Sequence, residues 1–179
     1  DVMWFRLSRK PEDGDQALAR FEPGRVVVGF NRGDYWQCAF VIGKGQDAEI
    51  RGRGLEAFRQ SLSSLLPDAA ARASEIKSWD QVKLLSVQVN RLTQWWKPGF
   101  LCIGDAAHAM SPVGGVGINL AIQDAVAASN ILTGPLRGGA VGDSALAAVQ
   151  ARREWPTRVT QRIQLTMQNR ILAAALKSK

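Results

Sequence analysis

The chain has 179 residues, of which 46% are hydrophobic and 22% charged, and a formal net charge of +7. This composition is typical of a globular protein and excludes a mainly disordered chain. No run approaches the roughly 18 consecutive apolar residues of a membrane span. Seven basic residues against Glu154 alone give residues 151–179 a net charge of +6. We interpret this charge as a solvated helix face, or as a face whose acidic partner is missing from this chain, rather than as a nucleic-acid-binding surface.

The first ninety residues predict an antiparallel sheet with one helix. Strands are expected over residues 2–7, 25–30 and 35–42. The Asn31–Asp34 turn joins the last two strands as a hairpin, whereas the polar stretch 11–24 predicts a loop. Apolar residues at helical spacing predict a helix over 54–66, and a strand is expected over 82–89. Tyr35, Trp36 and Gln37 either line a substrate pocket or pack within the hairpin.

From residue 100 the pattern changes. Phe100 to Ile103 is a short, wholly apolar run, which predicts a strand buried on both faces. A glycine-rich segment, 112–117, leads into an apolar helix expected over 118–132. A loop over 134–142 precedes a long helix that Asp143 or Ser144 caps. Pro156 should kink or interrupt this helix, and a further helix should run towards Leu176.

The two cysteines, Cys38 and Cys102, lie inside apolar runs, which favours buried free thiols in a reducing compartment. No export signal opens the chain, so we expect a cytoplasmic location. The residues from Asp1 to Leu7 look like the middle of a strand, and we therefore expect that the natural protein begins earlier.

The segment from Gly43 to Ala48 matches the dinucleotide-binding fingerprint and follows a predicted strand. A phosphate site needs a helix N-terminus without competing negative charge, whereas Asp47 and Glu49 place carboxylates there. No second strand ending in an acidic residue follows at about twenty residues, as the fingerprint requires. We interpret the segment as a strand-to-helix loop.

Residues 100–124 carry a more specific signal. Ligands of open α/β sheets bind beyond the carboxyl ends of strands. There, Gly104 lets a ligand approach the main chain, and Asp105 offers a carboxylate to ligand hydroxyls. The glycine-rich loop lacks bulky side chains, and the N-terminus of the next helix favours negative charge. A polyol followed by a flat ring that becomes anionic on reduction describes a flavin.

Residues 100–132 closely resemble the second FAD-binding motif of the para-hydroxybenzoate hydroxylase-like, or class A, flavoprotein monooxygenases. The residues in register with that motif are Gly104, Asp105, Ala106, Ala107, His108, Pro112, Gly114, Gly115, Gly117, Asn119 and Asp124. The resemblance implies that Asp105 binds the ribityl hydroxyls and that Pro112 borders the substrate cavity. The cofactor-binding set it implies is Gly104, Asp105, Pro112, Gly115, Gly117, Ile118 and Asn119, with the last three at the flavin pyrimidine edge.

The resemblance also implies a fold class, an α/β fold that forms part of the family's FAD-binding fold. It divides the chain into a substrate-domain sheet with a helix (1–90), the second FAD motif (91–133) and C-terminal helices (134–179). The family's N-terminal GxGxxG unit has no counterpart in the sequence, so the chain resembles the C-terminal portion of a member. Association with itself or with the missing half is expected through an exposed apolar face.

The implied activity is that of a monooxygenase, which uses FAD, NAD(P)H and O₂ to oxygenate an organic, aromatic or polycyclic, small-molecule substrate. Flavin-dependent halogenases and isoprenoid reductases carry a related motif and stay open as alternatives. A non-catalytic domain without flavin is a third hypothesis. No side chain of the sequence stands out as a catalytic acid or base.

Four residues near the motif have simpler interpretations. His108 is the only histidine, which excludes a multi-histidine metal site, and we expect local hydrogen bonding from it. Asp124 should bond the motif's own loop rather than act as a general base. Trp95 and Trp96 should anchor the edge of a sheet.

Overall fold

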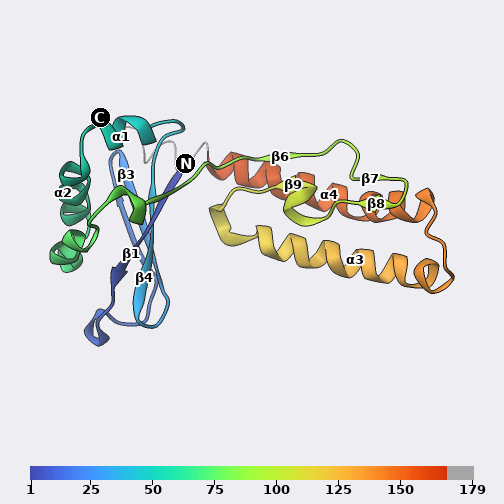
Figure 1. The fold of residues 1–179 in the computed structure, drawn as a ribbon, viewed down its shortest axis with the longest axis horizontal. Coiled ribbons are helices and arrows are strands. Elements are labelled where there is room, and N and C mark those ends of the chain that lie inside the picture. Colours follow the sequence, from blue (N-terminus) through green and yellow to red (C-terminus); the bar gives the residue numbers. More distant parts are fainter. Residues whose placement is uncertain (169–179) are drawn as a thin grey trace. The chain divides into compact units, whose positions relative to one another are not determined.

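The computed structural model describes residues 1–168, with the backbone alone at residues 67–69 and 113. The described chain forms two compact units, of which the first ends at Ser86 and the second begins at Val87. The first unit is built on a sheet, and the second contains two long helices (Figure 1). The whole flavin motif predicted from the sequence therefore lies within the second unit.

Five antiparallel strands form the sheet of the first unit. They are β1 (Val2–Ser8), β2 (Leu18–Glu22), β3 (Arg25–Asn31), β4 (Tyr35–Val41) and β5 (Lys83–Leu85). Their order across the sheet is β2-β3-β4-β1-β5. Along β1, Met3, Phe5 and Leu7 are buried while Arg6 and Ser8 are exposed. This alternation is what a sheet with one fully covered face requires.

Helical segments cover that face. They are α1 (Asp47–Gly52), α2 (Leu55–Leu65) and the 3-10 helices η2 (Pro67–Glu75) and η3 (Trp79–Gln81). In Figure 1, α2 lies beside the sheet. Its Phe58 packs edge-on against Phe5 and Phe40, with ring centroids 5.7 and 5.6 Å away. Leu62 and Leu65 of the same helix complete the core.

The prediction of a loop over residues 11–24 is wrong. This segment contains a 3-10 helix, η1 (Pro11–Asp13), and the strand β2. Because β2 is an edge strand with mostly exposed side chains, its polar composition resembles that of a loop. The Pro23-Gly24 pair was the missed signal, since Gly24 at φ 81° turns the chain between the paired residues Glu22 and Arg25.

The three predicted strands and the helix over 54–66 are confirmed to within one residue at each end. The strand expected over 82–89 is shorter, because β5 pairs with β1 only as far as Val2, where β1 begins. The Gly43–Ala48 segment is a loop up to Gln46, but the next helix begins at Asp47, earlier than expected. Gly43 N donates to Oε1 of Gln46 at 2.9 Å, so a side chain of the protein itself occupies this loop.

Of the three residues left undecided at the hairpin, Trp36 packs in the core and is 6% exposed. Its Nε1 donates to Oδ2 of Asp13 at 3.1 Å. Tyr35 and Gln37 alternate with it along β4 and therefore lie on the opposite face of the sheet. Of the cysteines, Cys38 is buried as expected, whereas Cys102 is only half-buried, because the short segment that carries it is not covered on both sides.

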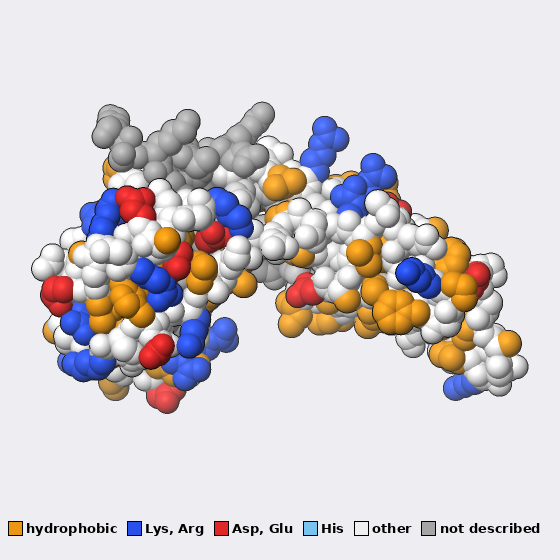
Figure 2. Space-filling model, turned by 45° about the horizontal axis from the view of Figure 1, so that its top comes forward, with side chains coloured by type: hydrophobic (Ala, Val, Ile, Leu, Met, Phe, Trp, Pro, Cys, Tyr) orange, Lys and Arg blue, Asp and Glu red, His pale blue; other side chains and the backbone are white. Residues whose placement is uncertain are grey.

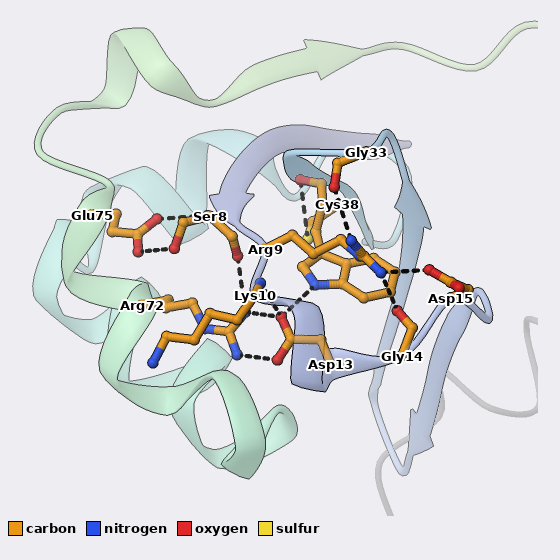
Figure 3. A network of polar contacts seen from close by, with 11 residues as sticks. Ser8, Arg9, Lys10, Asp13, Gly14, Asp15, Gly33, Cys38, Arg72 and Glu75 are labelled. Carbon is orange, nitrogen blue, oxygen red and sulfur yellow. Dashed lines mark hydrogen bonds and ion pairs between the residues drawn. The ribbon is translucent and has the colours of Figure 1, made fainter.

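An ion pair fixes the connection between β1 and β2 (Figure 3). The Arg72 guanidinium donates to both carboxylate oxygens of Asp13, at 2.5 and 2.7 Å, and to the carbonyl oxygen of Ser8 at 2.9 Å. Glu75 accepts hydrogen bonds from the backbone N and the Oγ of Ser8. The bonds from Arg72 hold the pKa of Asp13 well below its usual range. The link joins η1 to η2 across the end of the sheet.

The second unit is built on two long helices, α3 (Gly117–Arg137) and α4 (Asp143–Met167), which pack against each other. Two antiparallel ribbons accompany them: β6 (Asn90–Arg91) with β9 (His108–Ala109), and β7 (Trp96–Lys97) with β8 (Phe100–Leu101). The 3-10 helices η4 (Gly104–Ala106) and η5 (Val113–Gly115) flank β9. Through residue 168, no helix combines the length and the apolar character that a membrane crossing needs.

The expected strand buried on both faces, from Phe100 to Ile103, is wrong for this structure. β8 ends at Leu101, and Phe100 is 59% exposed. Among the described residues, β8 pairs with β7 alone, so no second neighbouring strand and no pair of covering layers bury it.

Both long helices exceed their predicted lengths. α3 continues through Gly134 and Pro135, which were expected in a loop, and α4 passes through Pro156 without interruption. A proline removes one backbone hydrogen bond, and packing between two long helices outweighs that loss. The part of the helix predicted towards Leu176 that follows residue 168 lies outside the described residues.

Candidate flavin site

The predicted flavin motif begins with a tight turn at Gly104 and Asp105. Gly104 has φ +58°, a left-handed conformation that side chains disfavour, and a Cβ there would lie 3.0 Å from the Cβ of Ala121 in α3. Ala107 N donates to Gly104 O at 2.9 Å and closes the turn. The Asp105 side chain is exposed. A carboxylate at this position can accept hydrogen bonds from a ligand that carries hydroxyls.

The glycine-rich loop leaves its main chain accessible. Gly115 N donates to Pro112 O at 3.0 Å, and Gly114 and Gly115 have φ values of +79° and +61°. A Cβ built at Gly115 would meet no atom within 4 Å. The main chain at this glycine can therefore be approached by a flat ring without a side chain in the way.

Directly after this loop, α3 begins. Its first intrahelical hydrogen bond runs from Leu120 N to Val116 O at 3.2 Å, so the amides of Gly117, Ile118 and Asn119 have no acceptor within the helix. The side chains of Ile118 and Asn119 are exposed. The positive end of a 21-residue helix thus follows the accessible loop and favours negative charge.

Asp124 of α3 is a buried carboxylate that is hydrogen-bonded to the turn at Gly104. Its Oδ2 accepts a hydrogen bond from Gly104 N at 3.0 Å and lies 2.6 Å from Nε2 of His108. Its Oδ1 accepts from Nε of Arg153 at 2.7 Å. Burial raises the pKa of Asp124, but the hydrogen bonds from His108, Arg153 and Gly104 together lower it below its usual value. Asp124 is therefore a carboxylate at neutral pH.

The simple interpretations of His108 and Asp124 are confirmed. His108 is buried and hydrogen-bonds locally, and Asp124 bonds the motif's own loop. Trp95 is 1% exposed and lies against the His108 ring, with centroids 5.1 Å apart. Trp96 is half-buried in β7. Trp95 lies just before the ribbon of β7 and β8 and Trp96 lies within it, so anchoring of a sheet edge by these residues stays a prediction.

Sequence reasoning missed a row of buried polar side chains on α4. Arg153, Thr157, Gln161 and Gln164 recur at helical spacing and are all buried. The Gln161 Nε2 donates to the carbonyl oxygens of Asn90 and Ala109, at 2.8 and 3.0 Å. Gln164 pairs with both backbone groups of Ser111. The interpretation of this segment as a solvated face is therefore wrong for Arg153, although Arg158 and Arg162 are exposed.

Comparison with known proteins decides the family. The model of the FAD binding domain family matches residues 1–163. The chain belongs to the FAD-binding domain family. A 6-methylpretetramide 4-monooxygenase of Streptomyces rimosus is 34% identical over 174 residues, which cover 96% of this chain and 41% of that protein. The FAD-dependent monooxygenase atmM of Aspergillus flavus is 28% identical over 130 residues, covering 66% of this chain and 26% of that protein.

Solved structures show the fold of this FAD-binding domain chain. PqsL of Pseudomonas aeruginosa, in complex with 2-aminobenzoylacetate, has a TM-score of 0.75 at 21% identity and is matched over 97% of this chain and 49% of that one. The oxygenase of 2-methyl-3-hydroxypyridine-5-carboxylic acid has a TM-score of 0.73 at 16% identity, and the match covers 97% of this chain and 48% of that one. The flavin-dependent halogenase CmlS has a TM-score of 0.59 at 21% identity, and the match covers 90% of this chain and 30% of that one. The predicted fold class, a partial FAD-binding fold of the para-hydroxybenzoate hydroxylase type, is confirmed.

The chain spans less than half the length of the curated relatives it matches. FAD is the cofactor of the family. The residues of this FAD-binding domain fit the flavin half of FAD, because an exposed carboxylate, an accessible glycine loop and a helix N-terminus follow one another within residues 104–119. At the Gly43–Gly45 loop, which matched a phosphate-binding fingerprint, Gly43 and Gly45 N donate instead to Gln46 and Asp1.

Proposed function

We propose that this chain supplies the flavin-facing half of the FAD site in a monooxygenase that uses NAD(P)H and O₂ to oxygenate an organic, aromatic substrate. The observation that carries the proposal is the turn at Asp105, whose exposed carboxylate follows an amide that Asp124 holds in place. Asp105 would bind the ribityl hydroxyls, and Pro112 would border the substrate. The ring would lie along Gly115, Gly117, Ile118 and Asn119.

Bound FAD supplies the electron transfer and the activation of O₂. The chain's own groups bind and orient it. The amides that open α3 stabilise negative charge at the pyrimidine edge of the ring, and they do so without reorganisation because the helix fixes them. The glycine loop admits the ring close to the main chain.

The proposal assigns a role to each part of the chain. Residues 1–90 supply the substrate-facing sheet, residues 91–133 the flavin contacts, and residues 134–179 the helices that support them. A cytoplasmic location is part of the proposal, and the two free cysteines support it.

The two curated relatives described above are monooxygenases by name, which supports this activity over others. The likeness to the halogenase CmlS concerns the fold alone. A halogenase needs a halide ion for its product, whereas a monooxygenase does not. NAD(P)H-dependent O₂ consumption and substrate oxygenation in halide-free buffer would therefore separate the two activities.

The assignment of Asp105 is tested by the Asp105→Ala variant. We expect its dissociation constant for FAD to rise about tenfold or more, because a charge-assisted hydrogen bond to the ribityl chain is lost. The matched control is Asp80→Ala, which removes an exposed carboxylate in the first unit. Flavin fluorescence titration measures the dissociation constant for FAD of both variants and of the unaltered chain. Equal affinity of Asp105→Ala and the unaltered chain would contradict the assignment.

A further inference from the structure

The Arg153 side chain extends from α4 to Asp124, the carboxylate that accepts a hydrogen bond from the turn at Gly104 and Asp105. It is buried, and its Nε donates to Oδ1 of Asp124 at 2.7 Å while its Nη2 donates to Oε1 of Gln123 at 2.9 Å. The other oxygen of Asp124 accepts from Gly104 N. Two consecutive hydrogen bonds therefore connect α4 to the backbone amide that immediately precedes Asp105.

This contact gives the buried Asp124 carboxylate a charged partner. Asp124 is 0% exposed, and a carboxylate without a charged partner at such a position is strongly disfavoured. Once ionised, its Oδ2 can accept hydrogen bonds from Gly104 N and from His108 together. Arg153 places a positive charge beside this carboxylate, whose hydrogen bond from Gly104 N holds the left-handed turn.

The same face of α4 holds the segment after the turn. Gln161 donates to Ala109 O at 3.0 Å, and Gln164 donates to Ser111 O at 2.8 Å and accepts from Ser111 N at 3.3 Å. These contacts lie just before Pro112 and the glycine loop. α4 thus fixes the main chain both before Asp105 and before the accessible glycines.

We propose that Arg153 is a positioning residue of the flavin site, which acts through Asp124 to set the direction of Asp105, and that Gln161 and Gln164 extend this role along the loop. The inference rests on the proposed function, since the turn matters for activity only if it binds flavin. It adds to that function a helix whose side chains need not touch the cofactor.

The test compares Arg153→Gln with Arg152→Gln, which removes the same charge from the exposed neighbouring position. Amide hydrogen exchange of Gly104 is measured by NMR in the complete chain, and FAD affinity by fluorescence titration. We expect Arg153→Gln to speed exchange at Gly104 by about tenfold or more and to weaken FAD binding by a similar factor. Arg152→Gln should change neither.

A purely structural role is separated by a double variant, Asp124→Leu with Arg153→Met. It should be more stable than Arg153→Met alone, because no buried carboxylate that has lost its Arg153 partner is left. Its Gly104 amide should nevertheless exchange fast and its FAD affinity stay low, because the acceptor is gone. If the double variant regained slow exchange at Gly104 and high FAD affinity along with its stability, the inference would be overturned.

The exchange measurement also separates this inference from the proposed function. Fast Gly104 exchange in Arg153→Gln supports the positioning role of Arg153 on the turn even if no variant binds FAD, in which case only the proposed function fails. Unchanged Gly104 exchange and unchanged FAD affinity overturn the inference while leaving the flavin site in place.

Discussion

Asp13 is the residue whose charge should make the first unit sensitive to acid. The hydrogen bonds from Arg72 lower its folded pKa, whereas an unfolded chain has an Asp pKa of about 3.9. A carboxyl group with a lowered folded pKa contributes stability above the unfolded pKa and loses it as the pH falls towards the folded pKa. Stability should therefore be steady at neutral pH and decrease below about pH 4.

The Asp13→Asn variant tests this at the same site. At pH 7 it should lower the free energy of unfolding by about 1–3 kcal/mol, because the charge-assisted hydrogen bonds between the mostly buried Arg72 and Asp13 side chains are weakened. Urea titrations at pH 7 and pH 3 compare it with the unaltered chain, with the exposed Asp80→Asn as control. The difference should shrink at the lower pH. A difference that is equal at both pH values would contradict the role given to the ion pair.

Gly104 is under two separate constraints, and they can be separated by mutation. Gly104→Ala should lower the stability of the second unit by about 2 kcal/mol, through the left-handed backbone and the contact with Ala121. Adding Ala121→Gly removes the contact but not the backbone strain. The double variant should therefore be less stable than Ala121→Gly alone, but by a smaller difference than the one that separates Gly104→Ala from the unaltered chain. Thermal unfolding measures all four proteins, and identical increments would show that the contact does not matter.

At the scale of single elements, Pro156 lowers the stability of α4. Pro156 has no N–H to donate to the carbonyl of Arg152, although the helix continues on both sides. Pro156→Ala should therefore stabilise the chain by about 1–3 kcal/mol. Thr166→Ala, at an exposed position of the same helix, should stay within about 0.5 kcal/mol of the unaltered chain. An unchanged or lower midpoint of unfolding for Pro156→Ala would contradict this account of the helix.

Which elements could be predicted depended on whether the signal was local. The alternation in β1 and the apolar spacing in α2 lie within single segments, and both elements were found. The ribbon of β6 and β9 has two residues in each strand. It accepts hydrogen bonds from the Gln161 amide of α4, a helix far away in the sequence. No pattern within such short segments predicts it, because the partner that stabilises it is separated by many residues.

The same distinction applies to the site. The glycines and Asp105 form one contiguous motif and were identified from it, and the bond of Asp124 to its own loop was expected. Arg153 belongs to the basic segment 151–179, whose composition predicts a solvated face. Its burial follows from the packing of α4 on α3, which the sequence of α4 alone does not specify.

At the scale of the whole molecule, α3 presents an apolar face. Ile118, Ile122 and Val126 follow at intervals of four residues and are each more than half exposed. Figure 2 shows hydrophobic side chains gathered in broad areas on the visible side of the second unit. Such faces promote association between proteins.

We therefore expect the chain to self-associate in a concentration-dependent manner that high salt does not weaken, since the contact is apolar. Ile122→Glu should shift the chain towards the monomer, whereas Ser144→Glu, exposed in the first turn of α4, should not. Sedimentation velocity over a range of concentrations measures both. A monomer at all concentrations, before any substitution, would contradict the prediction.

We propose that this chain binds the flavin half of FAD and makes no comparable contact with the adenosine diphosphate half. Parallel titrations of the 179-residue chain with riboflavin and with FAD test it most directly. The account predicts that both bind and that their dissociation constants differ by less than about tenfold, or 1.4 kcal/mol. FAD binding that is far tighter than riboflavin binding, or no binding of either, would contradict it.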